Sequence, residues 1–193
     1  SFRNLSYPLN WQDLFDYVGF PSYLKPFDGG GWKHVYKVES IDEFFAAYNE
    51  TDDIVMTLQE GIDFTEYYRC YCIGKKHVRI MPYEPRNPHH LRYQAGFAPS
   101  KEMLARLEEL CIQICTMLSY DFNTIEFAVR DGIPYAIDYM NPAPDAERTS
   151  VQEENFQWVL KTTATLLIDL AKQGRKVPQE YAWSSFIGVG GRG

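Results

Sequence analysis

A lysine and three consecutive glycines stand close together in residues 19–33. Lys25 ends a short β-prone segment, and Gly29, Gly30 and Gly31 follow it as a turn. Because glycine has no Cβ, the backbone N–H groups of such a turn can approach an anion closely. A lysine beside the turn adds a point charge, and the pattern predicts a triphosphate site, with a hairpin turn and a solvated lysine as the alternative. It is not the common phosphate loop, because no Gly-Lys-Ser/Thr opens a helix here.

Two carboxylates and an amide occur much further along the chain, in a stretch with the pattern of a hairpin. Two β-prone runs flank Asp131 and Gly132, a strong tight-turn dipeptide. Glu126 lies in the first run, Asp138 in the second, and Asn141 follows where the second run ends. Antiparallel pairing brings carboxylates from both strands together on one face. Carboxylate and amide oxygens suit a magnesium ion that also holds phosphates, so we expect a metal site here.

Taken together, these segments resemble the ATP-grasp superfamily. The family's signature is similar to Gly-Phe-Pro-x-x-x-Lys followed by three glycines, which residues 19–31 match. Its hinge segment resembles Gln-Glu-x-Ile, matched by residues 59–62, and its metal motif is similar to Glu-Phe followed later by acidic-x-Asn-Pro. These matches occur in the family's order between residues 8 and 175, although Tyr139 and Met140 both separate Asp138 from the asparagine. A local bulge would absorb the extra residue; otherwise the asparagine is only a turn residue.

The resemblance implies a role for each matching residue. Lys25 would neutralise the α- and β-phosphates, the hinge would read adenine, and Asp63 or Glu66 would accept the ribose hydroxyls unless these acids are merely solvated. The set expected to bind the nucleotide is Lys25, Gly29, Gly30, Gly31, Trp32, Gln59, Glu60, Gly61, Ile62, Asp63 and Glu66. The set expected to bind Mg²⁺ is Glu126, Asp138 and Asn141.

Two strand arginines are the candidate catalytic residues. Arg69 shares a strand face with Tyr67 and Tyr71 and resembles the strand arginine of many ATP-grasp ligases. It would stabilise the charge of a transferring phosphoryl group or bind a substrate carboxylate. The alternative is an arginine stacked on an aromatic sheet face. Arg79, on the next predicted strand, is the second candidate.

A proline-rich loop over residues 84–99 would cover the substrate as a lid that is mobile without ligand, or would be a variable loop with exposed polar side chains. Its side chains of interest are Arg86, His89, His90 and Arg92. Beyond the hairpin, Asp145 would orient an amine substrate or cap the next helix.

The composition excludes several classes of protein. The formal net charge is −7 over 193 residues, which argues against a general nucleic-acid binder. No apolar run approaches the roughly 20 residues of a membrane helix, and no signal peptide is visible. The four cysteines lack Cys-x-x-Cys spacing, so reduced core thiols of a cytoplasmic protein are favoured over a four-cysteine zinc site.

The helices and strands expected from the sequence indicate an α+β fold. In this fold, two lobes of antiparallel sheet and helices grip ATP between them. We expect helices over residues 10–18, after Ser40, after Ser100 and over 150–172. Strands are expected over 22–27, 33–38, 54–58, 64–73, 77–83 and in the later hairpin. The predicted organisation is a small lobe over 1–58, a hinge over 59–62, a large lobe over 63–180 and a tail over 181–193. The family's N-terminal domain is expected to be missing from this chain.

The function implied by the resemblance is an ATP- and Mg²⁺-dependent ligase. It would activate a small-molecule or peptide carboxylate as an acylphosphate for attack by an amine or similar nucleophile. Two alternatives stay open: a kinase-like phosphotransferase of the same fold, and a non-catalytic nucleotide-binding module of a larger protein. The absence of a convincing Ser-His-Asp or Cys-His pattern fits chemistry that needs no nucleophilic side chain.

Overall fold

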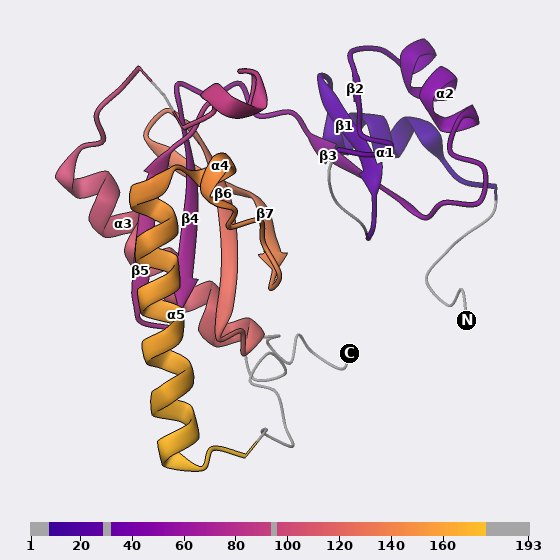
Figure 1. The fold of residues 1–193 in the computed structure, drawn as a ribbon. Coiled ribbons are helices and arrows are strands. Elements are labelled where there is room, and N and C mark those ends of the chain that lie inside the picture. The colour runs from indigo at the N-terminus through magenta and orange to yellow at the C-terminus, as the bar shows by residue number, and fades with distance from the viewer. Residues whose placement is uncertain (1–7, 29–31, 94–95, 177–193) are drawn as a thin grey trace, which may run out of the picture. The chain divides into compact units, whose positions relative to one another are not determined.

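The computed structural model describes residues 8–28, 32–93 and 96–176, which form two compact units divided between Asp63 and Phe64. Each unit combines an antiparallel sheet with helices, so the predicted α+β class is confirmed (Figure 1). None of the helices in these described ranges has the length and apolarity needed to cross a bilayer.

The first unit is a three-stranded sheet with two helices on one face. Its elements in chain order are α1 (Trp11–Val18), β1 (Ser22–Pro26), β2 (Tyr36–Val38), α2 (Ile41–Asn49) and β3 (Met56–Glu60). The strand order is β2-β1-β3, with both neighbours antiparallel to β1. The helices begin at predicted caps, because Asn10 accepts from Asp13 N–H and Ser40 accepts from Glu43 N–H.

Aromatic packing stabilises this unit. Phe15 of α1 and Phe44 of α2 meet edge-to-face with ring centroids 4.9 Å apart, over Leu24 and Val38 of the sheet. Trp11 packs on Phe44 at 5.6 Å. Aromatic pairs add about 0.5–1.5 kcal/mol each to the burial of their area, which helps so small a core to be stable.

The second unit is a four-stranded antiparallel sheet with helices on both faces. Its elements are β4 (Glu66–Ile73), β5 (His77–Pro82), a 3₁₀ turn (His89–Leu91), α3 (Lys101–Leu118), β6 (Phe122–Arg130), β7 (Ile133–Asn141), α4 (Arg148–Val151) and α5 (Glu153–Gln173). The strand order is β5-β4-β6-β7, which places β6 between the predicted hairpin partner β7 and the arginine-bearing β4.

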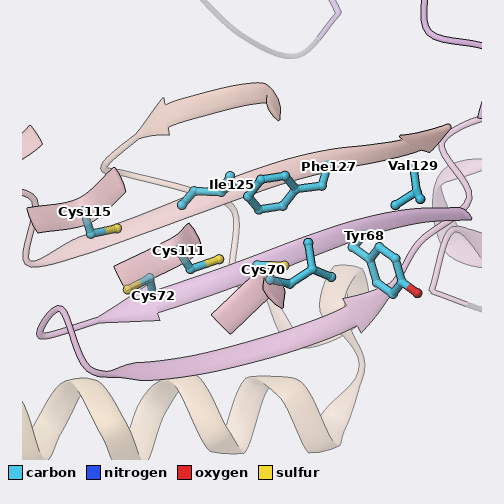
Figure 2. Close-up of a cluster of buried hydrophobic side chains, with 9 residues drawn as sticks. Tyr68, Cys70, Cys72, Cys111, Cys115, Ile125, Phe127 and Val129 are labelled. Atoms are coloured by element: carbon cyan, nitrogen blue, oxygen red, sulfur yellow. The ribbon is translucent and has the colours of Figure 1, made fainter. Parts of the chain in front are cut away.

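Strand alternation sends side chains to two separate cores. Tyr68, Cys70, Cys72, Ile125 and Phe127 face α3, which contributes Cys111 and Cys115 to the same core; all four cysteines are buried and unpaired as thiols (Figure 2). Tyr71 and Ile73 face the other way and pack against α4 and α5 through Val151 and Val159. Arg69 lies two residues before Tyr71 on β4, and Glu126 pairs with Arg69, so both side chains project to this second face.

Candidate functional site

The two predicted metal carboxylates lie side by side across the β6–β7 ladder. Glu126 pairs directly with Asp138, and directly opposed residues of an antiparallel pair project to the same face. Glu126 is partly buried, with 24% of its side chain exposed, whereas Asp138 is exposed. One carboxylate is thus held inside the unit, and the other lies at its surface.

A β-bulge accommodates the irregular spacing before Asn141. Thr124 pairs with Asn141 and Glu126 pairs with Asp138, so β7 advances one residue more than β6 over this interval. Thr124 and Glu126 share a face of β6 because they are two residues apart. Their pairing partners on β7 project to that same face. The expectation that a bulge absorbs the extra residue is confirmed, and Asp138 and Asn141 come to the same face as Glu126.

A buried asparagine stabilises the bulge from the neighbouring strand. Asn123 Nδ2 donates to the carbonyl of Tyr139 at 2.9 Å, and its Oδ1 accepts from the N–H of Asn141 at 2.8 Å. These backbone groups would otherwise lack the ladder partners that a bulge removes. Asn123 is fully buried, so its amide fixes the backbone on which Asn141 is carried.

Glu126 sits between a tyrosine and an arginine. Tyr67 Oη donates to Glu126 Oε2 at 2.7 Å, and Arg69 Nε lies 3.9 Å from Glu126 Oε1. Burial raises the pKa of the Glu126 carboxyl above its ordinary value; Arg69 and Tyr67 oppose this rise, and Asp138 adds to it. A nearby cation would favour the ionised form of this carboxyl, as expected for a metal ligand.

Arg69 is held by aromatic residues that follow β5. Its Nη1 donates to Tyr93 Oη at 3.1 Å, and its guanidinium carbon lies 6.0 Å from the centroid of the Tyr83 ring. Only 11% of the side chain is exposed. Burial alone would lower the pKa of Arg69, but Tyr93 and Glu126 outweigh it and raise this pKa, so the guanidinium stays charged. Arg69 is therefore a fixed positive charge beside Glu126.

Two other predicted site residues make contacts away from this pair. Arg79 donates through Nε to Asn155 Oδ1 at 2.8 Å and through Nη2 to Glu154 Oε1 at 2.6 Å, which ties β5 to the start of α5. Glu66 alternates to the α3 face, where it accepts a hydrogen bond from Tyr68 Oη. A role for either residue in binding or catalysis stays a prediction.

The loop after β5 is anchored through several of its polar groups. The guanidinium of Arg86 makes two hydrogen bonds of 2.7 Å to Glu84 and lies 4.4 Å from the Phe64 ring centroid. Arg92 donates to Tyr83 Oη at 3.3 Å. His90 is exposed, and the side chain of His89 lies outside the described residues. Lid motion of this loop stays a prediction.

Asp145 organises the start of α4. Its Oδ1 accepts from Glu147 N–H at 2.9 Å, and its Oδ2 accepts from the Ser150 hydroxyl. Tyr71 Oη also donates to the carbonyl of Asp145. Asp145 thus organises the turn that leads into α4, but the N-cap of this helix is Glu147 and no side chain caps it, so the predicted capping role of Asp145 is wrong. A role of Asp145 in orienting a substrate stays a prediction.

In the first unit, the predicted phosphate-binding lysine lies on the face of the sheet opposite the helices. Lys25 pairs with Thr57 and alternates with Leu24, which is buried in the aromatic core. Gln59 pairs with Tyr23, so it shares this second face with Lys25. The glycines at positions 29, 30 and 31 lie outside the described residues, while Trp32 is 56% exposed at a positive φ of 63°.

The predicted hinge begins as the end of a strand. Gln59 and Glu60 belong to β3, and the N–H of Gly61 donates to the carbonyl of Pro21 at 2.8 Å. A Cβ at Gly61 would lie 2.7 Å from that carbonyl oxygen, so the backbone approach requires glycine. Ile62 and Asp63 complete the segment up to the boundary between the units.

Three residues that organise the site were not predicted from the sequence. Tyr67 and Tyr93 bind Glu126 and Arg69, and Asn123 supports the bulge. The alternation that places Tyr67 on the face of Arg69 was a usable signal for the first. Tyr93 and Asn123 carried none, because their partners depend on tertiary packing.

The described residues contain no group of three or more His, Cys, Asp or Glu side chains arranged to hold a metal ion. The oxygen donors that the β6–β7 register brings to one face are the carboxylates of Glu126 and Asp138 and the amide of Asn141. This set fits Mg²⁺, which prefers oxygen ligands and usually keeps waters or substrate phosphates in its coordination shell.

No protein-family model matches the chain, and no curated protein matches its sequence significantly. Solved structures do match. D-alanine–D-alanine ligase from Bacillus anthracis aligns with a TM-score of 0.67 and 19% identity, over 86% of this chain and 60% of that one. The same enzyme complexed with ATP aligns with a TM-score of 0.68 and 18% identity, over 91% of this chain and 60% of that one. Biotin carboxylase from Campylobacter jejuni, in a complex with β-γ-ATP, aligns with a TM-score of 0.55 and 18% identity, over 87% of this chain and 40% of that one.

These structures belong to the ATP-grasp enzymes, and the chain has the ATP-grasp fold. It spans 60% of the length of the D-alanine–D-alanine ligase structures from Bacillus anthracis. At such low identity the likeness shows the fold alone, and a fold of this kind does not by itself fix the chemistry.

Proposed function

We propose that the chain is the nucleotide-binding core of an ATP- and Mg²⁺-dependent ligase that activates a carboxylate for attack by an amine or similar nucleophile. The observation that carries this proposal is the bulged register of β6 and β7, which brings Glu126, Asp138 and Asn141 to one face, with Arg69 directly opposite Glu126. D-alanine–D-alanine ligase and biotin carboxylase, whose structures share the fold, support the reaction class.

The proposed reaction has two steps. A carboxylate oxygen of the substrate attacks the γ-phosphorus of ATP, the bond to the bridging oxygen breaks, and ADP leaves. The amine nitrogen then attacks the acyl carbon of the resulting acylphosphate, inorganic phosphate leaves, and the nitrogen loses a proton. Phosphorylation is needed because a free carboxylate is a poor electrophile with no leaving group.

The residues of this chain contribute positions and charge rather than covalent chemistry. Lys25 would neutralise phosphate oxygens, and residues 59–62 would hold the adenine. Glu126, Asp138 and Asn141 would hold Mg²⁺, which would screen the charge of the phosphates. Arg69, a buried and permanently charged donor, would stabilise the negative charge that spreads over the transferring group.

The irregular spacing before Asn141 kept a non-catalytic module open as an alternative. The bulge argues against the module, because the register brings Asn141 to the face of the two carboxylates. An active enzyme is therefore preferred over a nucleotide-binding module, and the ligase and carboxylase structures that share the fold favour a ligase over a kinase-like enzyme.

Hydroxylamine trapping tests the reaction class. The chain is incubated with ATP, Mg²⁺, hydroxylamine and a panel of amino acids and dicarboxylates, and hydroxamate and ADP are measured together. The ligase proposal predicts equal amounts of hydroxamate and ADP with at least one carboxylate, and neither product with Glu126→Gln. ADP with a stable phosphorylated product and no hydroxamate would establish kinase-like chemistry instead. Nucleotide binding without ADP formation across the panel would favour the module.

A further inference from the structure

Arg69 and Glu126 face each other directly on β4 and β6, yet they do not form a hydrogen-bonded ion pair. The distance from Arg69 Nε to Glu126 Oε1 is 3.9 Å. An arginine and a carboxylate that meet in a protein normally close to about 2.7–2.9 Å, often through two parallel hydrogen bonds. The Nε atom is buried and has no hydrogen-bond partner among the described residues. The guanidinium and the carboxylate are therefore kept apart although their charges attract each other.

Two tyrosine hydroxyls engage the two halves of this pair. Tyr67 Oη donates to Glu126 Oε2, and Tyr93 Oη accepts from Arg69 Nη1. The first contact orients the carboxylate, and the second orients the guanidinium. Tyr67 comes from β4 itself, whereas Tyr93 follows the 3₁₀ turn and belongs to the loop.

A third tyrosine fixes the spacing between these two. The Tyr83 ring packs on Tyr93 at 5.0 Å and on Tyr67 at 5.9 Å between centroids. The N–H of Tyr83 donates to the carbonyl of Tyr67 at 2.9 Å, and only 4% of Tyr83 is exposed. The packing of the three rings thus restricts movement of the Tyr93 hydroxyl toward the carboxylate.

We propose that Tyr93 is a positioning residue that keeps Arg69 from closing on Glu126. This inference rests on the proposed function, because it matters only if the hairpin holds a cation and Arg69 meets an anion. With the pair held open, the carboxylate keeps its charge for the cation and the guanidinium keeps its donors for a phosphoryl or carboxylate group. Loss of the Tyr93 hydroxyl would let the guanidinium move about 1 Å onto Glu126 and compete with the cation.

Manganese binding tests the proposal without any turnover. Free Mn²⁺ is followed by electron paramagnetic resonance in the presence of a saturating non-hydrolysable ATP analogue. Tyr93→Phe keeps the ring and removes the hydroxyl, and it should weaken Mn²⁺ binding roughly 3–10-fold, the size expected for one redirected hydrogen bond. Tyr83→Phe is the matched control, because its hydroxyl accepts from Arg92 at 3.3 Å and bonds neither Arg69 nor Glu126. It should change the affinity less than twofold.

A double-mutant cycle separates positioning from mere packing. In an Arg69→Met background no guanidinium can close on the carboxylate, so Tyr93→Phe should have no further effect on Mn²⁺ binding. An equal loss in both backgrounds would overturn the positioning role. Tyr67→Phe offers a second route, because releasing Glu126 Oε2 should also weaken binding in the wild-type background and do so less in Arg69→Met.

The Glu126→Gln variant distinguishes failure of this inference from failure of the proposed function. If the wild-type chain binds Mn²⁺ no better than Glu126→Gln, the hairpin is not the metal site and both proposals fall. If Glu126→Gln loses the binding while Tyr93→Phe behaves like Tyr83→Phe, only the positioning role is wrong.

Discussion

The two units place their candidate site residues in opposite ways. In the first unit, the helices cover one face of the sheet with an aromatic core, and Lys25 and Gln59 lie on the other face. In the second unit, helices pack on both faces, and Arg69 and Glu126 lie within a buried network of tyrosines. The core and the candidate binding residues thus occupy separate faces in the first unit, whereas in the second unit the candidate residues are part of a buried network.

This difference has an energetic consequence. A side chain on the face away from the core can be removed with little loss of packing, so its substitution reports mainly on binding. A charge in a buried network supports its neighbours, so its removal costs stability as well as function. Three substitutions test this contrast.

The largest effect is expected from Arg69→Ala. The change leaves the partly buried Glu126 without its positive neighbour, and we expect a loss of about 3 kcal/mol, the low end of the range for breaking a buried pair, because Tyr67 still donates to the carboxylate. Urea unfolding of the chain measures the free energy of unfolding. A loss of unfolding free energy below about 0.5 kcal/mol, the usual range for surface substitutions, would contradict the difference between the two units.

A smaller total effect, confined to binding, is expected from Lys25→Ala. Loss of a charged hydrogen bond to phosphate should weaken ATP binding roughly 10–100-fold. The free energy of unfolding should stay within about 0.5 kcal/mol of the wild-type value. Titration calorimetry with ATP and Mg²⁺ measures the affinity. Lys37→Ala is the matched control, because Lys37 pairs with Tyr23 on the same face but binds Glu39 at 2.7 Å. Equal losses in both variants would indicate general charge attraction rather than a phosphate contact.

The smallest effect is expected from Asp121→Asn, at a partly exposed cluster of the second unit. Asp121 binds Lys75 at 2.6 Å and Arg175 at 2.9 Å. Burial alone would raise the pKa of Asp121, but Arg175 and Lys75 outweigh it and lower this pKa. Its stabilising effect is therefore present above the unfolded-state pKa of about 3.9 and disappears as the pH falls through the lower folded-state value.

Because exposed pairs are weak, the Asp121→Asn loss at pH 7 should stay below about 1 kcal/mol. Thermal unfolding of both proteins between pH 7 and pH 2 measures it, and the two curves should converge at the acid end. A difference that grows as the pH falls would have the wrong sign. A loss as large as that of Arg69→Ala would show that burial is not what separates the two sites.

Much of this fold could be predicted from local sequence signals. Asn10, Ser40 and Ser100 begin the helices that their side chains cap, and Gly174 ends α5 in the left-handed conformation. The Asp131-Gly132 turn joins β6 to β7 as expected. These features depend on a few neighbouring residues, so periodicity and capping chemistry were sufficient.

The contacts within the site could not be predicted in the same way. Tyr67 meets Glu126 through β4–β6 register, and Tyr93 meets Arg69 through the path of a loop. Arg79 binds α5, whose position over the sheet is set by tertiary packing. The bulge could be predicted only in part. The spacing of Asp138 and Asn141 indicated that it exists, but the hydrogen bonds from Asn123 that support it could not be predicted from the sequence.

The central claim is that the β6–β7 hairpin binds the metal that accompanies ATP. Calorimetric titration of ATP with Mg²⁺ and with a chelator tests it, in the wild-type chain and in Asp138→Asn. Asp131→Asn is the matched control, because it removes the same charge from the turn of the same hairpin, where φ is 54° and asparagine is tolerated. The account predicts that Mg²⁺ strengthens ATP binding in the wild type and in Asp131→Asn, but has little effect in Asp138→Asn. The same magnesium dependence in all three proteins would contradict it.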